Sequence, residues 1–236
     1  MGLLDLPAPV FDFIDRSLLG ALPPLLRLVL WAIAGAAISL ALYRLLSPQR
    51  RIAQAKAAAL DARRRLNAHD GDLETALPLM RQSMTAALRH VGLVFPAAII
   101  ASLPVLALLI WLDAAYGYQL PQDRQAPAVS VEPATYSGQW RSDGSVEVRD
   151  QSGTEVARLA LAEPITHIEK HQWWNVLIGN PAGYLPEKGP IDSITIALPE
   201  RQYLPIGPDW LRSWVTVALT VLVIASLLIM RLARIA

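Results

Sequence analysis

The sequence predicts an α-helical membrane protein with three transmembrane helices, a cytoplasmic helical hairpin and a small extracytoplasmic β-domain inserted between the second and third spans. Of the 236 residues, 53% are hydrophobic and 17% are charged, whereas soluble domains carry roughly 25% charged residues. Three apolar stretches reach the roughly 20 residues that a helix needs to cross the hydrocarbon of a bilayer. Between the second and third stretches, alternating residues and turn signals replace the apolar runs, which is typical of strands.

The N-terminal segment, residues 1–22, is predicted to be a short helix lying in the membrane interface. It lacks the basic start of a cleavable signal and carries three aspartates, so we do not interpret it as a signal peptide. Apolar residues recur at helical spacing, as expected of an interfacial helix: Val10, Phe11, Ile14, Leu18 and Leu22. The alternative is a frayed lead-in to the first span.

The three spans are predicted at residues 23–46, 91–112 and 209–232. Small residues on one face of the first span favour close helix packing, namely Ala32, Gly35, Ala36 and Ser39. Arg27 lies near the outer end of this span and Arg44 near its inner end. Ionisable residues at such positions are often functional, but both side chains are also long enough to reach water from the ends of the span.

Residues 47–90 are predicted to form a basic helical hairpin. The turn signal "AHDGD" separates two apolar seams with a period near 3.5 residues. The first seam is Ile52, Ala55, Ala59, Ala62 and Leu66, and the second is Leu73, Leu77, Met80, Met84, Ala87 and Val91. Because proline is tolerated in the first turn of a helix, Pro78 predicts a second helix that starts near Leu77 and continues into the second span. The alanine-rich first seam buries little area, so this hairpin should be marginal by itself.

Charge distribution predicts the orientation of the spans. Residues 43–92 hold nine Lys and Arg against four acids, whereas residues 113–209 hold thirteen acids and seven bases. Lys and Arg gather beside the cytoplasmic ends of membrane helices. The N-terminus and the long loop are therefore expected outside, and the hairpin and the C-terminus inside.

Residues 119–202 are predicted to form a β-domain of about six strands. Residues 142–144 and 151–153 separate alternating runs and read as hairpin turns. Trp173 and Trp174 lie in a segment that reads as a strand, which would point them to opposite faces. One is then expected in the core and the other is a candidate partner contact; the alternative is that both pack within the domain.

The sequence contains no motif that predicts catalysis. His167, Glu169 and His171 would share one face of a strand, but no Cys and no further His of the domain completes a metal site. Phosphate-binding loops and nucleophile elbows are absent from the sequence. We therefore expect no enzyme activity, no cofactor and no metal, and the net charge of +1 gives no reason to expect specific nucleic-acid binding.

The order of these segments resembles the YidC/oxidase-assembly insertase superfamily. The resemblance lies in "LYRLLSPQRR" at the end of the first span, in "LPLMRQSMTAALRHVGLVFPAAIIASLPVLALLIWLDAAYG" and in the return through "YLPIGPDWLRSW". It covers residues 1–118 and 203–236 and is closest to the minimal three-span branch. That branch includes the archaeal YidC-like proteins, the third subunit of the ER membrane protein complex and the ER transmembrane-and-coiled-coil protein. The inserted β-domain departs from this branch, whose members have a short outer loop there.

This resemblance implies a protein of the prokaryotic cytoplasmic (inner) membrane that inserts or assembles membrane-protein clients through a polar groove open to the cytoplasm and to lipid. The family's basic residue at the inner part of the first span corresponds to Arg44. Polar residues of the second and third helices are further groove candidates: Gln82, Ser83, Arg89, Thr216 and Thr220. The alternatives are an accessory subunit of a larger membrane complex, docked through the β-domain, and an oligomeric ion channel. The basic hairpin is also a candidate contact for anionic lipid or the ribosome.

Overall fold

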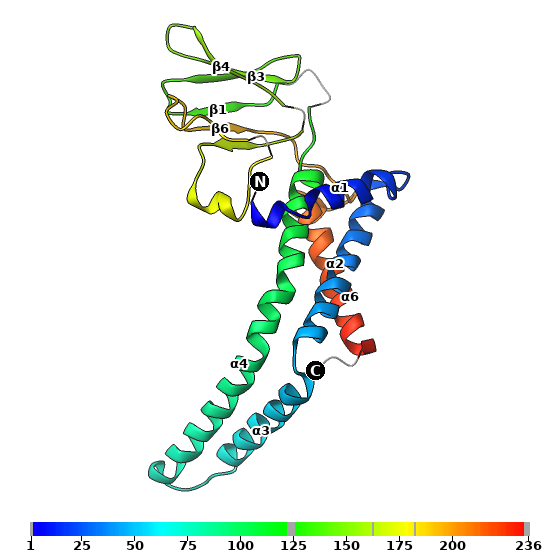
Figure 1. Cartoon of the computed structure of the whole chain (residues 1–236), viewed down its shortest axis with the longest axis vertical. Coiled ribbons are helices and arrows are strands. Elements are labelled where there is room, and N and C mark those ends of the chain that lie inside the picture. Colours follow the sequence, from blue (N-terminus) through cyan, green and yellow to red (C-terminus); the bar gives the residue numbers. More distant parts are fainter. Residues whose placement is uncertain (1, 122–125, 162, 182, 234–236) are drawn as a thin grey trace. The chain divides into compact units, whose positions relative to one another are not determined.

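The computed structural model describes residues 2–121, 126–161, 163–181 and 183–233. The protein is mostly helical (57%) with a small region of two β-sheets, in the order shown in Figure 1. It divides into two compact units. We call residues 1–31 and 106–220 the β unit, and residues 32–105 and 221–236 the hairpin unit.

Three helices are long and apolar enough to cross a membrane: α2 (Pro24–Leu46), α4 (Leu73–Leu112) with the turn that extends it, and α6 (Trp214–Ala233). The π-helical turn η2 (Asp113–Gly117) extends α4 to a helical stretch of 45 residues. A separate short helix, α5 (Asp209–Arg212), precedes α6. The break falls at Ser213, whose backbone is extended (φ −69°, ψ 154°).

The predicted small-residue face of α2 is buried. Ala32, Gly35 and Ala36 are buried and Ser39 is half-buried. The Ser39 hydroxyl donates a hydrogen bond of 2.7 Å to the carbonyl of Ala101 on α4. Small side chains let helix backbones approach closely enough for such a bond, which explains why this face carries no larger residue.

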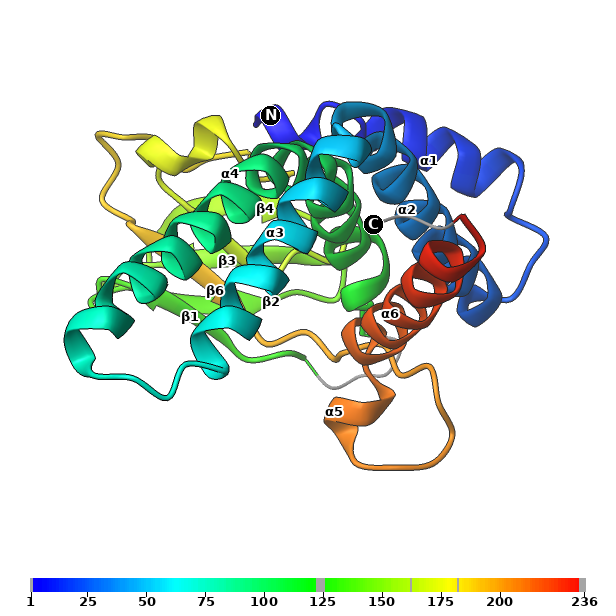
Figure 2. The same ribbon diagram turned by 90° about the horizontal axis from the view of Figure 1, so that it is seen from below.

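The first apolar seam of the predicted hairpin is confirmed in α3 (Gln49–Asn67). Ile52, Ala55 and Ala62 are buried, and Ala59 and Leu66 are half-buried. In Figures 1 and 2, α3 runs beside the first half of α4, to which it is joined by a short loop.

Two predictions for the second arm are wrong. The helix starts at Leu73 rather than near Leu77, so Pro78 lies inside it together with Pro96 and Pro104. The predicted seam also lies on the wrong face, because its six residues are exposed: Leu73, Leu77, Met80, Met84, Ala87 and Val91. A parallel stripe with the same period is half-buried instead: Ala76, Leu79, Ser83, Ala86, His90 and Leu93. This half of α4 is apolar on more than one side, so periodicity alone could not select the packed face.

The N-terminal segment forms the short 3₁₀ helix η1 (Leu3–Asp5) and the helix α1 (Ala8–Ser17). Its predicted apolar face is divided. Phe11 and Ile14 pack against a buried aromatic cluster, whereas Val10 and Leu18 are exposed. A helix that is apolar on two sides in this way can contact a protein core and a second apolar environment at once.

The β-domain contains six strands within the described residues, as the sequence predicts. β1 (Val129–Glu132), β6 (Ser193–Ile196) and β5 (His167–Glu169) form one antiparallel sheet in that order. β2 (Ser137–Trp140), β3 (Ser145–Arg149) and β4 (Glu155–Ala160) form the second. Valine, isoleucine and leucine side chains from both sheets make one shared core, so the domain is a small sandwich.

Both predicted hairpin turns are present, and aspartates organise them. Asp143 Oδ1 accepts hydrogen bonds from the Ser145 backbone N–H (3.0 Å) and hydroxyl (2.6 Å). Asp150 Oδ1 does the same with Ser152 (2.9 and 2.6 Å). Gly144 and Gly153 supply the positive φ of each turn (79° and 81°), a conformation that other residues adopt at a cost.

The first turn gives a prediction about acid. The hydroxyl and N–H of Ser145 lower the pKa of Asp143 from 3.8 to about 2. A lowered folded-state pKa means that the ionised Asp143 stabilises the turn above pH 3.8 and that this stabilisation is lost as the pH falls through about 2. In a ¹³C NMR titration of the Asp143 carboxyl, we expect a midpoint near 2 that moves toward 3.8 in Ser145→Ala. The matched Ser152→Ala should leave the Asp143 midpoint unchanged. A midpoint near 3.8 in the unsubstituted protein would contradict the assigned hydrogen bonds.

Candidate functional site

A groove lined by both polar and apolar side chains lies between α3 and the first half of α4, within the hairpin unit. Its open volume is about 1300 Å³. Arg51, Gln54, Ala55 and Ala58 line it from α3. From α4 it is lined by Glu74, Leu77, Pro78, Arg81, Gln82, Thr85, Ala86, Arg89 and Leu93. The side chains from α4 recur every three or four residues, so they form one helix face along the groove.

The groove carries positive charge that has no internal partner. Arg51, Arg81 and Arg89 line it with one acid, Glu74, so the charged side chains sum to +2. Within the part of the chain that the structure describes, none of these three guanidinium groups forms an ion pair. Guanidinium presents five N–H donors in a fixed fork that suits carboxylates. The groove can therefore bind an acidic or polar segment by charge-assisted hydrogen bonds.

The structure brings two of the predicted groove residues together here. Gln82 and Arg89 both line the groove. Ser83, the neighbour of Gln82, is on the half-buried stripe of α4 and does not line it.

Arg44 lies in the last turn of α2. Its Nη1 donates a hydrogen bond of 3.0 Å to the carbonyl of Ala233 at the end of α6. The last carbonyls of a helix have no partner within the helix and carry partial negative charge. Arg44 therefore caps α6 in this structure and is not among the residues that line the groove.

Thr216 and Thr220 belong to the β unit. The Thr216 hydroxyl donates a hydrogen bond of 2.6 Å to the carbonyl of Trp210, across the break between α5 and α6. Thr220 is exposed. Thr216 therefore has a local structural role at the start of α6.

Trp173 and Trp174 lie in a 3₁₀ helix, η3 (Trp173–Val176), so their prediction as strand residues is wrong. Both are on the surface, with 79% of Trp173 and 43% of Trp174 exposed. The reason is local: Asn175 is buried and its Oδ1 accepts a hydrogen bond of 2.6 Å from the Gln172 N–H. This bond closes the 3₁₀ turn and leaves no core position for either indole.

A second group of polar side chains is buried in the β unit around Asp15 of α1. Only 5% of Asp15 is exposed. Its Oδ1 accepts hydrogen bonds from Trp31 Nε1 (2.9 Å), Tyr116 Oη (2.6 Å) and Arg27 Nε (3.1 Å). Arg27 Nη2 contacts Oδ2 as an ion pair. Arg27 therefore pairs with α1 instead of extending to water.

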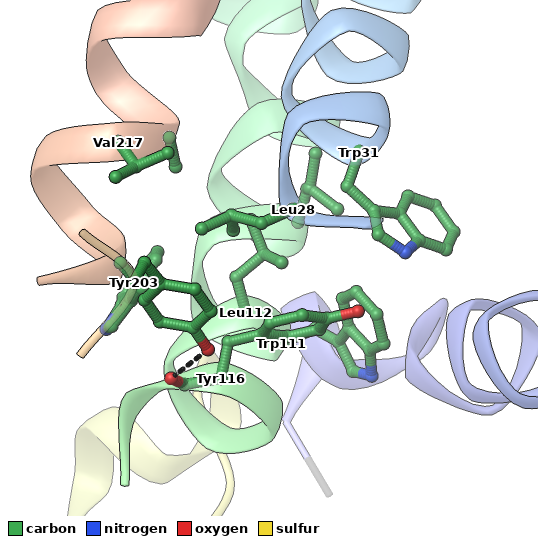
Figure 3. Close-up of a cluster of buried hydrophobic side chains, with 10 residues drawn as sticks. Leu28, Trp31, Trp111, Leu112, Tyr116, Tyr203 and Val217 are labelled. Carbon is green, nitrogen blue, oxygen red and sulfur yellow. Dashed lines mark hydrogen bonds between the residues drawn. The ribbon is translucent and has the colours of Figure 1, made fainter. Parts of the chain in front are cut away.

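Aromatic side chains surround this carboxylate. Figure 3 shows Trp31, Trp111, Tyr116 and Tyr203 gathered with Leu28 and Leu112. The Tyr203 hydroxyl donates a hydrogen bond of 2.8 Å to the Tyr116 carbonyl. Burial raises the pKa of Tyr203 to about 12, which keeps the hydroxyl protonated and able to donate. Trp111 Nε1 donates to Asp12 Oδ1 at 2.9 Å, so both α1 carboxylates accept indole N–H bonds.

The sequence carries a signal for this cluster in the spacing of two aspartates. Asp12 and Asp15 are three residues apart and so share one face of α1, beside the apolar Phe11 and Ile14. A carboxylate on an apolar helix face is costly unless it is paired. Arg27 was the available partner.

His167 and Glu169 lie on β5 with His167 Nε2 at 3.5 Å from Glu169 Oε2. His171 lies beyond the strand, where its ring makes an edge contact with Tyr184 at 4.8 Å between centroids. Among the described residues no group of three or more His, Cys, Asp or Glu side chains is placed to hold a metal ion.

Comparisons with protein-family models, with curated proteins and with solved structures gave no match to this chain. The geometry of the two sites and the pattern of the sequence are therefore the basis for the proposals below.

The Asp15 cluster gives a prediction about stability. Asp15→Asn leaves the half-buried Arg27 guanidinium without a counter-charge, and breaking a buried pair in this way costs up to about 3 to 5 kcal/mol. Asp12→Asn, with 43% of the aspartate side chain exposed, keeps an oxygen for Trp111 and should cost under about 1 kcal/mol. Thermal unfolding in detergent micelles, followed by circular dichroism, measures both.

The double variant Asp15→Asn/Arg27→Gln completes the cycle. It should be more stable than Asp15→Asn alone, because the unpaired charge is gone. If Asp15→Asn melts at the same temperature as Asp12→Asn, the ion pair does not stabilise the fold.

Proposed function

We propose that this protein inserts or assembles membrane-protein clients, and that the α3–α4 groove receives their polar segments. The observation that carries the proposal is a groove lined by three arginines without ion-pair partners among the described residues, two of which, Arg81 and Arg89, lie on the helix that continues into a candidate membrane span. Seven of the residues that line it are polar or charged, and alanine, leucine and proline side chains lie between them.

The length of α4 supports a location partly inside and partly outside a bilayer. Its 40 residues extend about 60 Å at 1.5 Å per residue, whereas the hydrocarbon core is about 30 Å thick. Residues 93–112 contain no Asp, Glu, Lys or Arg and belong to a helix that is apolar enough to span. We therefore propose that this half crosses the bilayer and that the half that lines the groove projects into water. The groove then opens where the helix enters the membrane.

The orientation follows from charge. Nine Lys and Arg against four acids in residues 43–92 favour a cytoplasmic hairpin. We propose a multi-pass protein of a prokaryotic cytoplasmic membrane, with the N-terminus and the β-domain outside and the C-terminus inside.

Such a function needs no catalytic residue. Moving a short polar tail across a membrane is opposed by the cost of charge in hydrocarbon, about 3 kcal/mol per charged residue at the centre of a helix on insertion scales. In a groove with guanidinium donors near the membrane surface, hydrogen bonds to arginine replace part of the hydrogen bonds to water that the tail loses. The resemblance to the three-span YidC-like branch points to the same activity, with the inserted β-domain as a specialisation.

The second candidate is an accessory subunit of a larger complex. The exposed Trp173 favours it, since exposed aromatic side chains are common at interfaces. Co-purification in mild detergent separates the two: a subunit stays bound to one complex in fixed proportion, whereas an insertase recovers many clients at low occupancy.

Orientation is tested first by single cysteines, since the sequence contains no native Cys. Gln151→Cys, at the exposed β3–β4 turn, should react with a membrane-impermeant maleimide in intact cells. Ala68→Cys, at the exposed end of α3, should react only after lysis. The reverse pattern of labelling would overturn the proposed topology.

The groove is tested by removing its charge. Arg81→Gln/Arg89→Gln should slow insertion of a single-span test protein with a short acidic tail by about tenfold. This corresponds to about 0.7 kcal/mol for each exposed charge contact. The same test protein with a neutral tail should be affected less, because its tail gains less from the guanidinium groups. Protease protection in vesicles that contain the purified protein measures insertion.

Arg63→Gln/Arg65→Gln is the matched control, because these arginines are exposed on α3 and do not line the groove. It removes the same net charge from the same hairpin. If the control slows insertion as much as the groove variant, general charge on the hairpin matters and the groove does not. If neither changes insertion, the proposed activity of the groove is wrong.

A further inference from the structure

The β unit presents an exposed apolar surface made of two segments far apart in the sequence. Residues of η1 and α1 contribute Leu3 (62% exposed), Leu6 (64%), Val10 (57%) and Phe13 (67%). Residues at η3 contribute Trp173 (79%), Trp174 (43%), Val176 (68%), Leu177 (48%) and Ile178 (43%). We call these nine residues the apolar rim.

Backbone hydrogen bonds hold the two segments of the apolar rim together. The Leu4 N–H donates to the Leu177 carbonyl at 2.9 Å. Asp5 Oδ2 accepts from the Gly179 N–H at 2.6 Å and from the Gly2 N–H at 2.8 Å. Gly2 lies so close to Leu177 that a Cβ there would be 2.5 Å from its carbonyl oxygen. The rim is therefore one surface that folding builds, and its nearest carboxylate is occupied by backbone donors.

The indoles and the apolar side chains of η3 are exposed because the turn is rigid. Asn175 bonds the Gln172 N–H and, through its Nδ2, the Ile178 carbonyl at 3.1 Å. The rings of Trp173 and Trp174 meet edge to face, with centroids 5.7 Å apart. Because this turn is already closed, its apolar side chains can bind a surface without a large loss of conformational entropy.

The composition of the rim fits the interfacial region of a lipid bilayer. Residues 172–181 include two tryptophans and no charged residue. Tryptophan concentrates at membrane interfaces, because its ring is apolar and its N–H remains near water. Exposed apolar patches of this extent mark either protein or membrane contacts, and the rim is continuous with α1, whose exposed stripe has the character of an interfacial helix.

The position of η3 within the β unit agrees with this assignment. In Figure 1, η3 (yellow) lies beside η1 and α1, on the side of the β-domain from which the ends of α2 and α4 extend. The β3–β4 hairpin lies on the far side of the sheets. If the helices cross the bilayer, the rim faces its surface and the hairpin faces water.

From these observations we infer that the apolar rim inserts into the outer leaflet and that Trp173, Trp174 and Val176 anchor the β-domain to lipid. This rests on the membrane location in the proposed function and is independent of the insertase activity. It assigns to Trp173 and Trp174 a lipid surface as their partner in place of a protein.

Single-cysteine variants test the inference in the full-length protein, reconstituted alone into phosphatidylcholine and phosphatidylglycerol vesicles. Val176→Cys carries an environment-sensitive fluorophore on the rim. Gln151→Cys carries it on the exposed β3–β4 turn, and Ile38→Cys on the exposed side of α2. Two quenchers are compared: aqueous iodide, and a nitroxide attached near the headgroup end of a lipid chain.

The label at Val176 should be quenched by the lipid nitroxide and not by iodide, with emission shifted to the blue relative to the label at Gln151. The label at Gln151 should show the opposite quenching. If Val176 and Gln151 are quenched alike by iodide, the rim is in water and the inference is wrong.

Two further outcomes are distinguishable. If the label at Ile38 is not quenched by lipid nitroxides, the helices are not inserted, and the proposed membrane location fails together with this inference. If the label at Val176 is quenched by iodide in vesicles of the pure protein but shielded from both quenchers in native membranes, a protein partner covers the rim. That result would overturn the lipid assignment in favour of a docking surface.

Discussion

The buried carboxylate of Asp15 is the constraint on which the arrangement of the β unit depends. A charge with 5% of its residue exposed is stable only when its oxygens are fully bonded. Here the donors come from α2 and from the π turn at the end of α4, 101 residues away in the sequence. Satisfying one carboxylate thus fixes α1 against two other helices. Because η1 precedes α1 directly, it also determines where Leu4 meets Leu177.

The parts of the fold that the sequence predicts are those with local causes. The three apolar stretches, the small residues of α2 and the Asp-Gly and Ser-Gly turns depend on residues close together in the sequence, and each is present where it was expected. The start of α4 and the break at Ser213 were not predicted. The pairing of Asp15 with Arg27 and Tyr116 is different. An acid on an apolar helix face indicates that some donor must pair with it. The pattern of a single sequence does not indicate which donor this is when the partners lie 12 or 101 positions away.

The incorrect face of α4 has a separate cause. In a water-soluble hairpin the apolar stripe is the packed stripe, because exposed apolar area is unfavourable. Here Leu73, Met84 and Leu88 are 65% to 73% exposed, while small and polar residues such as Ser83 and His90 are half-buried. The assignment of Trp173 and Trp174 to a strand was wrong for a comparable reason: alternation is also compatible with a 3₁₀ turn, and the hydrogen bond of Asn175 decides between them.

The distribution of paired and unpaired charge separates structural sites from candidate binding sites in this chain. In the β-domain, Oε1 of the buried Glu147 accepts a hydrogen bond of 2.5 Å from Arg149 Nε, and Oε2 forms an ion pair with Arg141 Nε at 2.6 Å. These contacts, that of Arg149 first, lower the pKa of Glu147. Asp15 is equally well bonded. The charge of each of these carboxylates is already paired with an arginine inside the fold. Arg51, Arg81 and Arg89 are the contrasting case, because they line one open groove and are still solvated. In the proposed function, a client carboxylate that binds them would displace water from the guanidinium groups and break no internal ion pair, so binding would be reversible. Reversible capture is what the proposed release of each client into the bilayer requires.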